Sequence, residues 1–160
     1  MGLSDLTNRP TPQVITGYND VVDIGCGDYH SLIVRKNGDA YSFGFNNEGQ
    51  LGLGTITDQE TSPIKVVNGL NVKKAYGSVR FSMLITSIGL IYGMGNNNGF
   101  NLGTFDNNDK NVPTPVSNQN YKVRKLALGS QHSVALTTTG RIYVFGKNDV
   151  NLILFSNFYF

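Results

Sequence analysis

The chain has 160 residues, enough for one domain with a core of ordinary size. Charged residues make up 15% of it and the formal net charge is +2, too small to predict binding to nucleic acid or to a membrane surface. The basic residues are scattered. The two densest groups, Lys73-Lys74 and Lys122 to Lys125, are expected to lie on a solvated strand edge rather than in a phosphate-binding patch.

The chain contains one cysteine, Cys26, in the apolar run Val21–Cys26. We expect a small buried hydrophobic residue rather than a reactive thiol, and no disulfide can form within the chain. The first residues lack the basic start and apolar core of a signal peptide, and the longest apolar run, Leu152–Phe155, is far too short to span a membrane. These features predict an intracellular protein, in the cytoplasm or the nucleus.

Short apolar runs separated by turn-forming residues follow one another along the chain. Residues 1–16 are polar, and Pro10 and Pro12 exclude a central strand there. Residues 55–62 are expected to form a polar loop, and the prolines to lie between strands rather than within them. The predicted strands in the first half of the chain are Val21–Cys26, His30–Val34, Ala40–Phe43, Ile64–Val67 and Val72–Tyr76.

Two of these runs flank Asn37-Gly38, a strong signal for a tight β-hairpin. A glycine-punctuated segment from Asn46 to Gly54 then leads the chain out of the hairpin. The stretch from Gly27 to Gly54 is the unit from which the whole chain is built, because its features recur with a step of 51 residues. The recurring sets are Gly38, Gly89 and Gly140; Tyr41, Tyr92 and Tyr143; Gly44, Gly95 and Gly146; Asn46, Asn97 and Asn148; Ser31, Ser82 and Ser133; and His30, Phe81 and His132.

This repeat predicts a β-propeller. A unit of about 50 residues with about four short strands has the size of a propeller blade, and one such sheet must stack on neighbours to bury both faces. Gly38 and its counterparts supply the positive φ of a two-residue or bulged turn. Gly44 and its counterparts suit a place where backbones crowd, such as the axis of a radial assembly. The predicted core includes Tyr41, Phe43, Tyr92, Tyr143 and Phe145.

Three segments together resemble the repeat of the RCC1 (regulator of chromosome condensation) family. They are Gly27-Asp-Tyr-His-Ser-Leu, Asn37-Gly-Asp-Ala-Tyr-Ser-Phe-Gly and the exit segment from Asn46 to Gly54, and the third copy repeats them from Gly129. The resemblance covers nearly the whole chain. It implies a seven-bladed propeller of four-stranded antiparallel blades, of which this chain holds about three.

The copies differ in how closely they follow the family. The middle copy has Ser78 where glycine is expected and Phe81 where histidine is, and the third copy departs from the pattern after Asn148. We therefore divide the chain into a partial entering repeat (1–26), a repeat (27–77), a degenerate repeat (78–128) and an incomplete repeat (129–160) with an aberrant tail. The tail is either a non-homologous end or a strand that docks on a neighbour. The open ends of the arc are expected to need further blades or a partner chain.

His30 and His132 are the side chains with two plausible roles. In the structural interpretation, each ring packs at the start of its strand and hydrogen-bonds backbone in the neighbouring turn. In the functional interpretation, they line one rim of the propeller. The resemblance implies contact of such histidines with a Ran-like GTPase, and the middle copy offers Arg80-Phe81 instead. The candidate partner-binding rim is therefore His30, Arg80, Phe81 and His132.

No pattern of catalytic, cofactor-binding or metal-binding residues emerges. The sequence has no Gly-x-Ser-x-Gly motif, and two histidines and one cysteine on different repeats do not suit a zinc site. We expect no enzyme and no cofactor. The first hypothesis is a non-catalytic protein–protein interaction module, and the second, from the resemblance, is a guanine-nucleotide exchange factor for a small Ran-like GTPase. A truncated product without independent function is the third.

Overall fold

The computed structural model describes residues 2–67 and 69–149, which contain eleven strands and no helix. The strands form three antiparallel sheets in which chain neighbours pair with each other. The first sheet comprises β1 (Val21–Cys26), β2 (His30–Arg35), β3 (Ala40–Phe45) and β4 (Gln59–Lys65). The second comprises β5 (Val72–Gly77), β6 (Phe81–Thr86), β7 (Ile91–Gly95) and β8 (Lys110–Pro115). The third comprises β9 (Val123–Leu128), β10 (His132–Thr137) and β11 (Ile142–Gly146).

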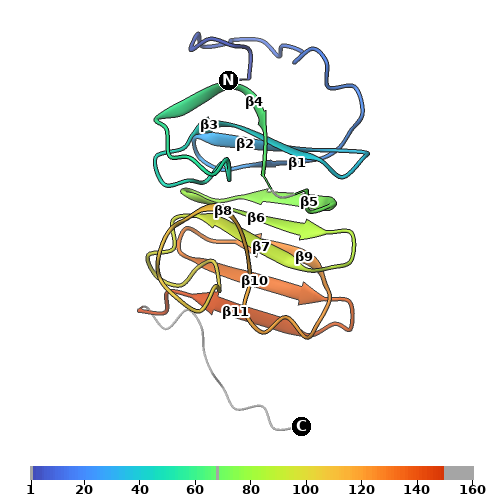
Figure 1. The fold of residues 1–160 in the computed structure, drawn as a ribbon, viewed down its shortest axis with the longest axis vertical. Coiled ribbons are helices and arrows are strands. Elements are labelled where there is room, and N and C mark those ends of the chain that lie inside the picture. The colour runs from blue at the N-terminus through green and yellow to red at the C-terminus, as the bar shows by residue number, and fades with distance from the viewer. Residues whose placement is uncertain (1, 68, 150–160) are drawn as a thin grey trace, which may run out of the picture.

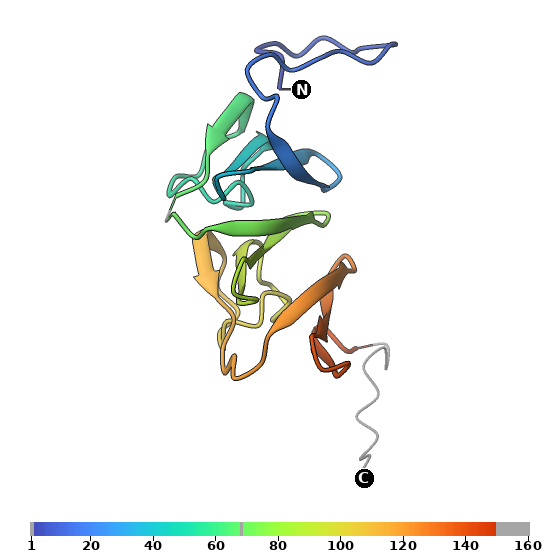
Figure 2. The same ribbon diagram turned by 90° about the vertical axis from the view of Figure 1, so that its right-hand side faces the viewer.

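The three sheets stack in chain order along the long axis of the molecule (Figure 1). Seen from the side, they spread as an open arc (Figure 2), as consecutive propeller blades do. The expected all-β architecture of antiparallel sheets is thus confirmed. The sequence repeat and the sheets are out of phase, because the stretch 27–77 begins just before β2 and ends with β5 of the next sheet.

The β2–β3 hairpin turns at Asn37-Gly38, as its sequence predicts. The Gly38 amide donates to the Arg35 carbonyl at 2.9 Å, and φ at Gly38 is +86°. The amide of Asp39 donates to Oδ1 of Asn37 at 3.0 Å, which fixes the turn. The turn also joins two sheets, since the Gly38 carbonyl accepts from the amide of Val72 at 2.8 Å.

Apolar side chains fill the two junctions between successive sheets. Successive side chains of a strand point to opposite faces of its sheet. The second sheet can therefore pack one face on the first sheet and the other face on the third. The junction of the first and second sheets contains Leu32, Val34, Ala40, Val66, Val72, Ala75, Leu84 and Met94. The junction of the second and third contains Phe81, Met83, Ile85, Ile91, Leu102, Val116, Val123, Leu126 and Ala135.

The predicted aromatic core is only partly correct. Phe43 is buried, whereas the three tyrosines of the set are half-buried. Tyr143 and Phe145 pack against the edge of the second junction, and Tyr143 stacks on Tyr121. Rings with a hydroxyl favour such positions, where one edge is dry and the other reaches water.

The expected polar loop 55–62 is wrong over its last residues, because β4 already begins at Gln59. Pro63 lies inside this strand rather than before it. β4 is the outermost strand of the first sheet and pairs only with β3. A proline lacks a backbone donor, and an edge strand tolerates that loss on its unpaired side.

Cys26 is exposed, so the expectation of a buried residue is also wrong. Asp23 and Gly25 of β1 lie against Ala75 of the second sheet. Because side chains alternate along a strand, Cys26 points to the other face of β1, where Ile24 is exposed as well. Burial of this apolar run would require a neighbour on that face.

Gly44 lies where backbones crowd, as its place in the repeat predicts. A Cβ at Gly44 would lie 2.4 Å from the carbonyl oxygen of Tyr29 and 2.7 Å from Cα of His30. The crowding arises within one sheet, where Gly44 pairs with His30, rather than at an axis shared by several sheets.

Candidate functional site

The four residues of the predicted rim lie at one end of the sheets, which we call the exit-loop end. His30, Phe81 and His132 are the first residues of β2, β6 and β10, and Arg80 directly precedes β6. The loops 46–58 and 96–109, which we call the first and second exit loops, leave β3 and β7 at the same end because the strands are antiparallel. The repeat therefore places these residues at equivalent positions on successive sheets.

His30 lies inside the junction of the first and second sheets, with 2% of its surface exposed. Its Nε2 is 2.7 Å from Oγ of Ser82 on β6. The Ser82 hydroxyl donates to the Gln50 carbonyl at 2.8 Å, so its oxygen is free to accept the Nε2–H of a neutral ring. This arrangement favours the structural interpretation, with a side chain of the next sheet as partner instead of backbone in a turn.

The surroundings of His30 keep the ring neutral. Burial lowers its pKa to about 4, and the Asp28 carboxylate, the smaller of the two effects, raises it. The Nδ1 atom, which would take the second proton, has no hydrogen-bond partner in the described part of the chain. Gly27 provides the room for the ring, since a Cβ there would lie 2.3 Å from Cε1. The ring thus links two sheets and the first exit loop.

Phe81 takes the equivalent place in the second junction and is 1% exposed. Here Ser133 donates to the Asn101 carbonyl at 2.8 Å, which reproduces the bond from Ser82 to Gln50 without a histidine. Ser78 stands where the first copy has Gly27, and its hydroxyl donates to the Gly129 carbonyl at 2.6 Å. The departures of the middle copy therefore build an apolar version of the same junction.

Arg80 and His132 are the accessible members of the predicted set. The Arg80 side chain is 64% exposed, and its Nη1 donates to Oε1 of Glu48 in the first exit loop at 2.7 Å. His132 is half-buried at the start of β10. Of the four predicted residues, the structure thus leaves two in contact with solvent at the exit-loop end and encloses two in the junctions.

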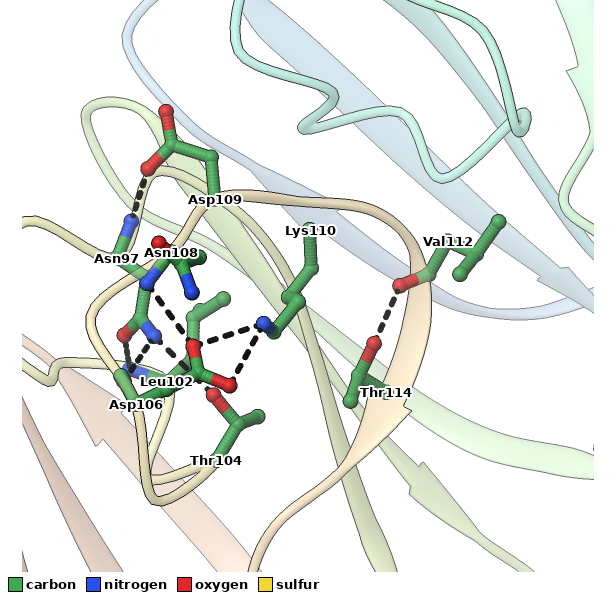
Figure 3. Close-up of polar contacts among 9 residues, drawn as sticks. All are labelled: Asn97, Leu102, Thr104, Asp106, Asn108, Asp109, Lys110, Val112 and Thr114. Carbon is green, nitrogen blue, oxygen red and sulfur yellow. Dashed lines mark hydrogen bonds and ion pairs between the residues drawn. The ribbon is translucent and has the colours of Figure 1, made fainter.

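A buried asparagine organises each exit loop from within. Asn97 accepts from the Leu102 amide at 3.0 Å and donates to Thr104 Oγ1 at 3.1 Å and to the Asp106 carbonyl at 2.6 Å (Figure 3). In the first loop Asn46 makes two matching bonds, to the Leu51 amide and the Thr55 carbonyl at 3.1 Å each, and its third bond, to Thr57 Oγ1 at 3.2 Å, goes to a different position of the loop. The recurrence of these asparagines therefore reflects a loop frame.

Charged groups close the second exit loop. The Asp109 carboxylate accepts from the backbone amide of Asn97 at 2.7 Å. Lys110 donates to both carboxylate oxygens of Asp106, at 2.7 and 2.9 Å (Figure 3). The ion pair and the amide of Asn108 lower the pKa of the Asp106 carboxyl. All these groups bind one another, so the frame leaves recognition to the side chains outside it.

Two phenylalanines of the second exit loop were not expected from the motif analysis. Phe100 and Phe105 are 53% and 83% exposed, and both have left-handed backbones, with φ of +63° and +75°. The first exit loop has Gly49 and Gly54 at the equivalent positions, with φ of +79° and +80°. A comparison of the two copies residue by residue would have found these aromatic replacements.

Clustered metal ligands and membrane-spanning helices are not found among the described residues. Across residues 2–67 and 69–149, no group of three or more histidine, cysteine, aspartate or glutamate side chains is placed to hold a metal ion. Nor does any helix in the described part of the chain have the length and apolar character needed to cross a membrane. The exit-loop end instead combines a rigid frame with exposed aromatic and charged side chains.

Comparison with known proteins identifies the repeat. Family models for the Regulator of chromosome condensation (RCC1) repeat match residues 21–50 and 123–151 in one version, and 37–85 and 89–136 in another. The chain is 34% identical over 140 residues to human Probable E3 ubiquitin-protein ligase HERC4, covering 84% of this chain and 13% of that protein. It is 36% identical over 143 residues to human X-linked retinitis pigmentosa GTPase regulator, covering 87% and 14%.

A solved structure supports the same fold. Prp20p from Saccharomyces cerevisiae, a protein with binding properties to Gsp1p and histones, superposes with a TM-score of 0.71 at 26% identity. The alignment covers 81% of this chain and 34% of Prp20p. The chain thus corresponds to about a third of a β-propeller of this type and to less than a sixth of the curated relatives it matches.

Proposed function

Because the chain belongs to the Regulator of chromosome condensation (RCC1) repeat family, we propose that it is a non-catalytic protein-interaction module that binds another protein through its exit-loop end. An intracellular location, in the cytoplasm or the nucleus, is part of this proposal. Loops held on a rigid frame suit recognition, because their side chains can vary while the sheets stay unchanged.

The observation that carries the proposal is the pair Phe100 and Phe105. A left-handed backbone costs a residue other than glycine about 1 kcal/mol or more, and the first exit loop avoids that cost with glycines. The second loop accepts the cost at two positions and exposes an aromatic ring at each. Aromatic side chains, phenylalanine included, are enriched at protein–protein interfaces. We therefore infer that binding of a partner offsets the backbone strain.

Arg80 supports the same surface from the neighbouring turn. Its guanidinium group is held by Glu48 yet remains largely exposed, so it is positioned before a partner arrives. Arginine is another residue type enriched at interface centres. The proposed surface consists of Arg80, Phe100 and Phe105.

Partner capture tests this surface. The full chain and its Phe100→Asn/Phe105→Asn variant are used as baits in extract of the source cells, and bound proteins are quantified by mass spectrometry. Ile56→Asn is the matched control, since Ile56 is also exposed but lies in the first exit loop. We expect a specific protein with wild type and with the control, and about a tenfold lower yield with the double variant. Equal yield with all three baits would contradict the proposal.

A second candidate is nucleotide exchange on a small GTPase. It is supported by the relatives, one of which binds Gsp1p and another of which is a GTPase regulator. The test follows release of mant-GDP from a panel of Ran-like GTPases with the full chain. Exchange activity predicts faster release that Arg80→Glu or His132→Asn reduces. An unchanged release rate excludes this function for the GTPases tested.

A further inference from the structure

A basic cleft lies at the opposite end of the sheets, toward which the β6 and β10 arrows point in Figure 1. It has a volume of about 290 Å³ and lies between the starts of β5 and β9. Lys73, Lys74, Lys122 and Arg124 line it, and Ile88, which is 61% exposed, forms part of its apolar wall. The two basic groups lie on edge strands of their sheets, as expected, and the fold brings together groups that are about 50 residues apart in the sequence.

The cations of the cleft have few partners. Lys74 Nζ lies 3.4 Å from the Arg124 carbonyl oxygen, a weak contact to backbone. In the described residues, no carboxylate forms an ion pair with Lys73, Lys122 or Arg124. Like charges gathered on two adjacent strands repel one another, which costs stability unless an anion is bound.

The repeat shows that the fold does not require these cations. Positions 71, 73 and 74, at the start of the second sheet, are Asn, Lys and Lys, and positions 122, 124 and 125, at the start of the third sheet, are Lys, Arg and Lys. The first sheet has Asp20, Val22 and Asp23 at the equivalent positions. The equivalent strands β1, β5 and β9 therefore form with acidic, apolar or basic residues at these positions. The requirements of the fold do not explain why β5 and β9 carry basic residues.

We propose that the basic cleft binds a short acidic segment of a partner protein that carries an apolar residue among its carboxylates. The carboxylates would pair with Lys73, Lys122 and Arg124, and the apolar residue would cover Ile88. A long polyanion fits less well. Asp23 lines the neighbouring hollow that Lys74 shares with the first sheet, where it would repel a continuous phosphate backbone, and the formal net charge of the chain is only +2.

This inference deepens the proposed role in protein binding but concerns a separate surface. Phe100, Phe105 and Arg80 lie at the exit-loop end, and substitutions in the cleft leave them in place. Loss of binding at one end with retention at the other therefore separates the two proposals.

The test uses the full chain and a fluorescein-labelled peptide of six acidic residues around a central leucine, followed by fluorescence anisotropy at two salt concentrations. We expect Arg124→Glu to weaken binding about fivefold, and Lys73→Glu/Arg124→Glu about twentyfold. Lys36→Glu is the matched control, because Lys36 is exposed on the first hairpin and has the same charge. It should change the affinity less than twofold, and circular dichroism should show the same fold for all variants.

Two results would overturn the inference. One is the absence of saturable binding, or an equal loss with Lys36→Glu, which would mean attraction to net charge alone. The other is tighter binding of a duplex oligonucleotide than of the peptide with the same dependence on Lys73 and Arg124. Weaker binding of a peptide with alanine in place of leucine would support the contact with Ile88.

Discussion

The first and second exit loops have the same frame but expose different side chains. Asn46 and Asn97 make equivalent bonds inside the two loops, so the backbone is set in the same way. At two positions outside the frame the backbone is left-handed in both loops, and the residues there are glycines in the first loop and phenylalanines in the second. Residues shared by the copies thus report what the fold needs, and residues that differ report what the fold does not need.

The two junctions extend this comparison to the interior. In both, a serine hydroxyl donates to the carbonyl of the preceding exit loop. The first junction adds a neutral histidine to that bond, whereas the second fills the same volume with Phe81. The hydrogen bond from serine is therefore common to both junctions, and the histidine adds a polar group that makes the first junction sensitive to pH.

The largest effect should come from the frame itself. We expect Asn46→Ala and Asn97→Ala to lower the free energy of unfolding by about 3 to 4 kcal/mol each, because buried loop groups lose their partners. Urea denaturation of the full chain measures this. Asn98→Ala, at an exposed position, should cost less than about 0.5 kcal/mol. Unequal costs for the two buried asparagines would break the equivalence of the loops.

The first junction should weaken in mild acid. Unfolded His30 takes up a proton near its ordinary pKa of 6.5, whereas the folded ring does so only near 4. Its contribution is fully present above pH 6.5 and is lost as the pH falls to about 4, amounting to about 3 kcal/mol. Unfolding free energies measured across this window would show the loss.

His30→Phe converts the first junction into the type of the second and serves as the control. Near pH 7 we expect it to change the free energy of unfolding by less than about 1.5 kcal/mol, because a ring of similar volume fills the site. The variant should lack the part of the acid sensitivity that depends on His30. If wild type and variant lost stability in parallel, the neutral ring would not be the cause.

A smaller effect should separate the two exit loops. Gly54→Ala introduces a side chain at φ of +80° with its nearest contact at 3.8 Å, so only backbone strain of about 1 kcal/mol is added. Phe105→Asn should gain up to about 1 kcal/mol, since asparagine tolerates the left-handed region. Thermal unfolding distinguishes these opposite signs, and a loss with Phe105→Asn would show that Phe105 serves the fold.

Local sequence signals were reliable where a residue acts within its own unit. The strand Val21–Cys26 follows from an apolar run and the turn at Gly38 from Asn-Gly alone. β4 was missed in part because a proline ends most strands, and only the sheet order shows that β4 is an edge. The exposure of Cys26 likewise depends on which face of β1 has a neighbour, and no local pattern contains that information.

The candidate site was harder to predict because it depends on stacking. His30 and Phe81 occupy motif positions, but only the next sheet, with Ser82 or Ser133, decides that their rings are enclosed. Phe100 and Phe105 do have a sequence signal, namely aromatic residues at glycine positions of the repeat. That signal appears when the copies are compared for their differences instead of their similarities.

Site-specific photo-crosslinking tests the central claim most directly, namely that residues free to differ between the copies form the partner surface. A photoreactive phenylalanine analogue is placed at position 105 or, as the control, at position 56 of the full chain, and each protein is irradiated in extract of the source cells. The account predicts a crosslink to one specific protein from position 105 and none from position 56. Equal crosslinking from both positions, or none from position 105, would contradict it.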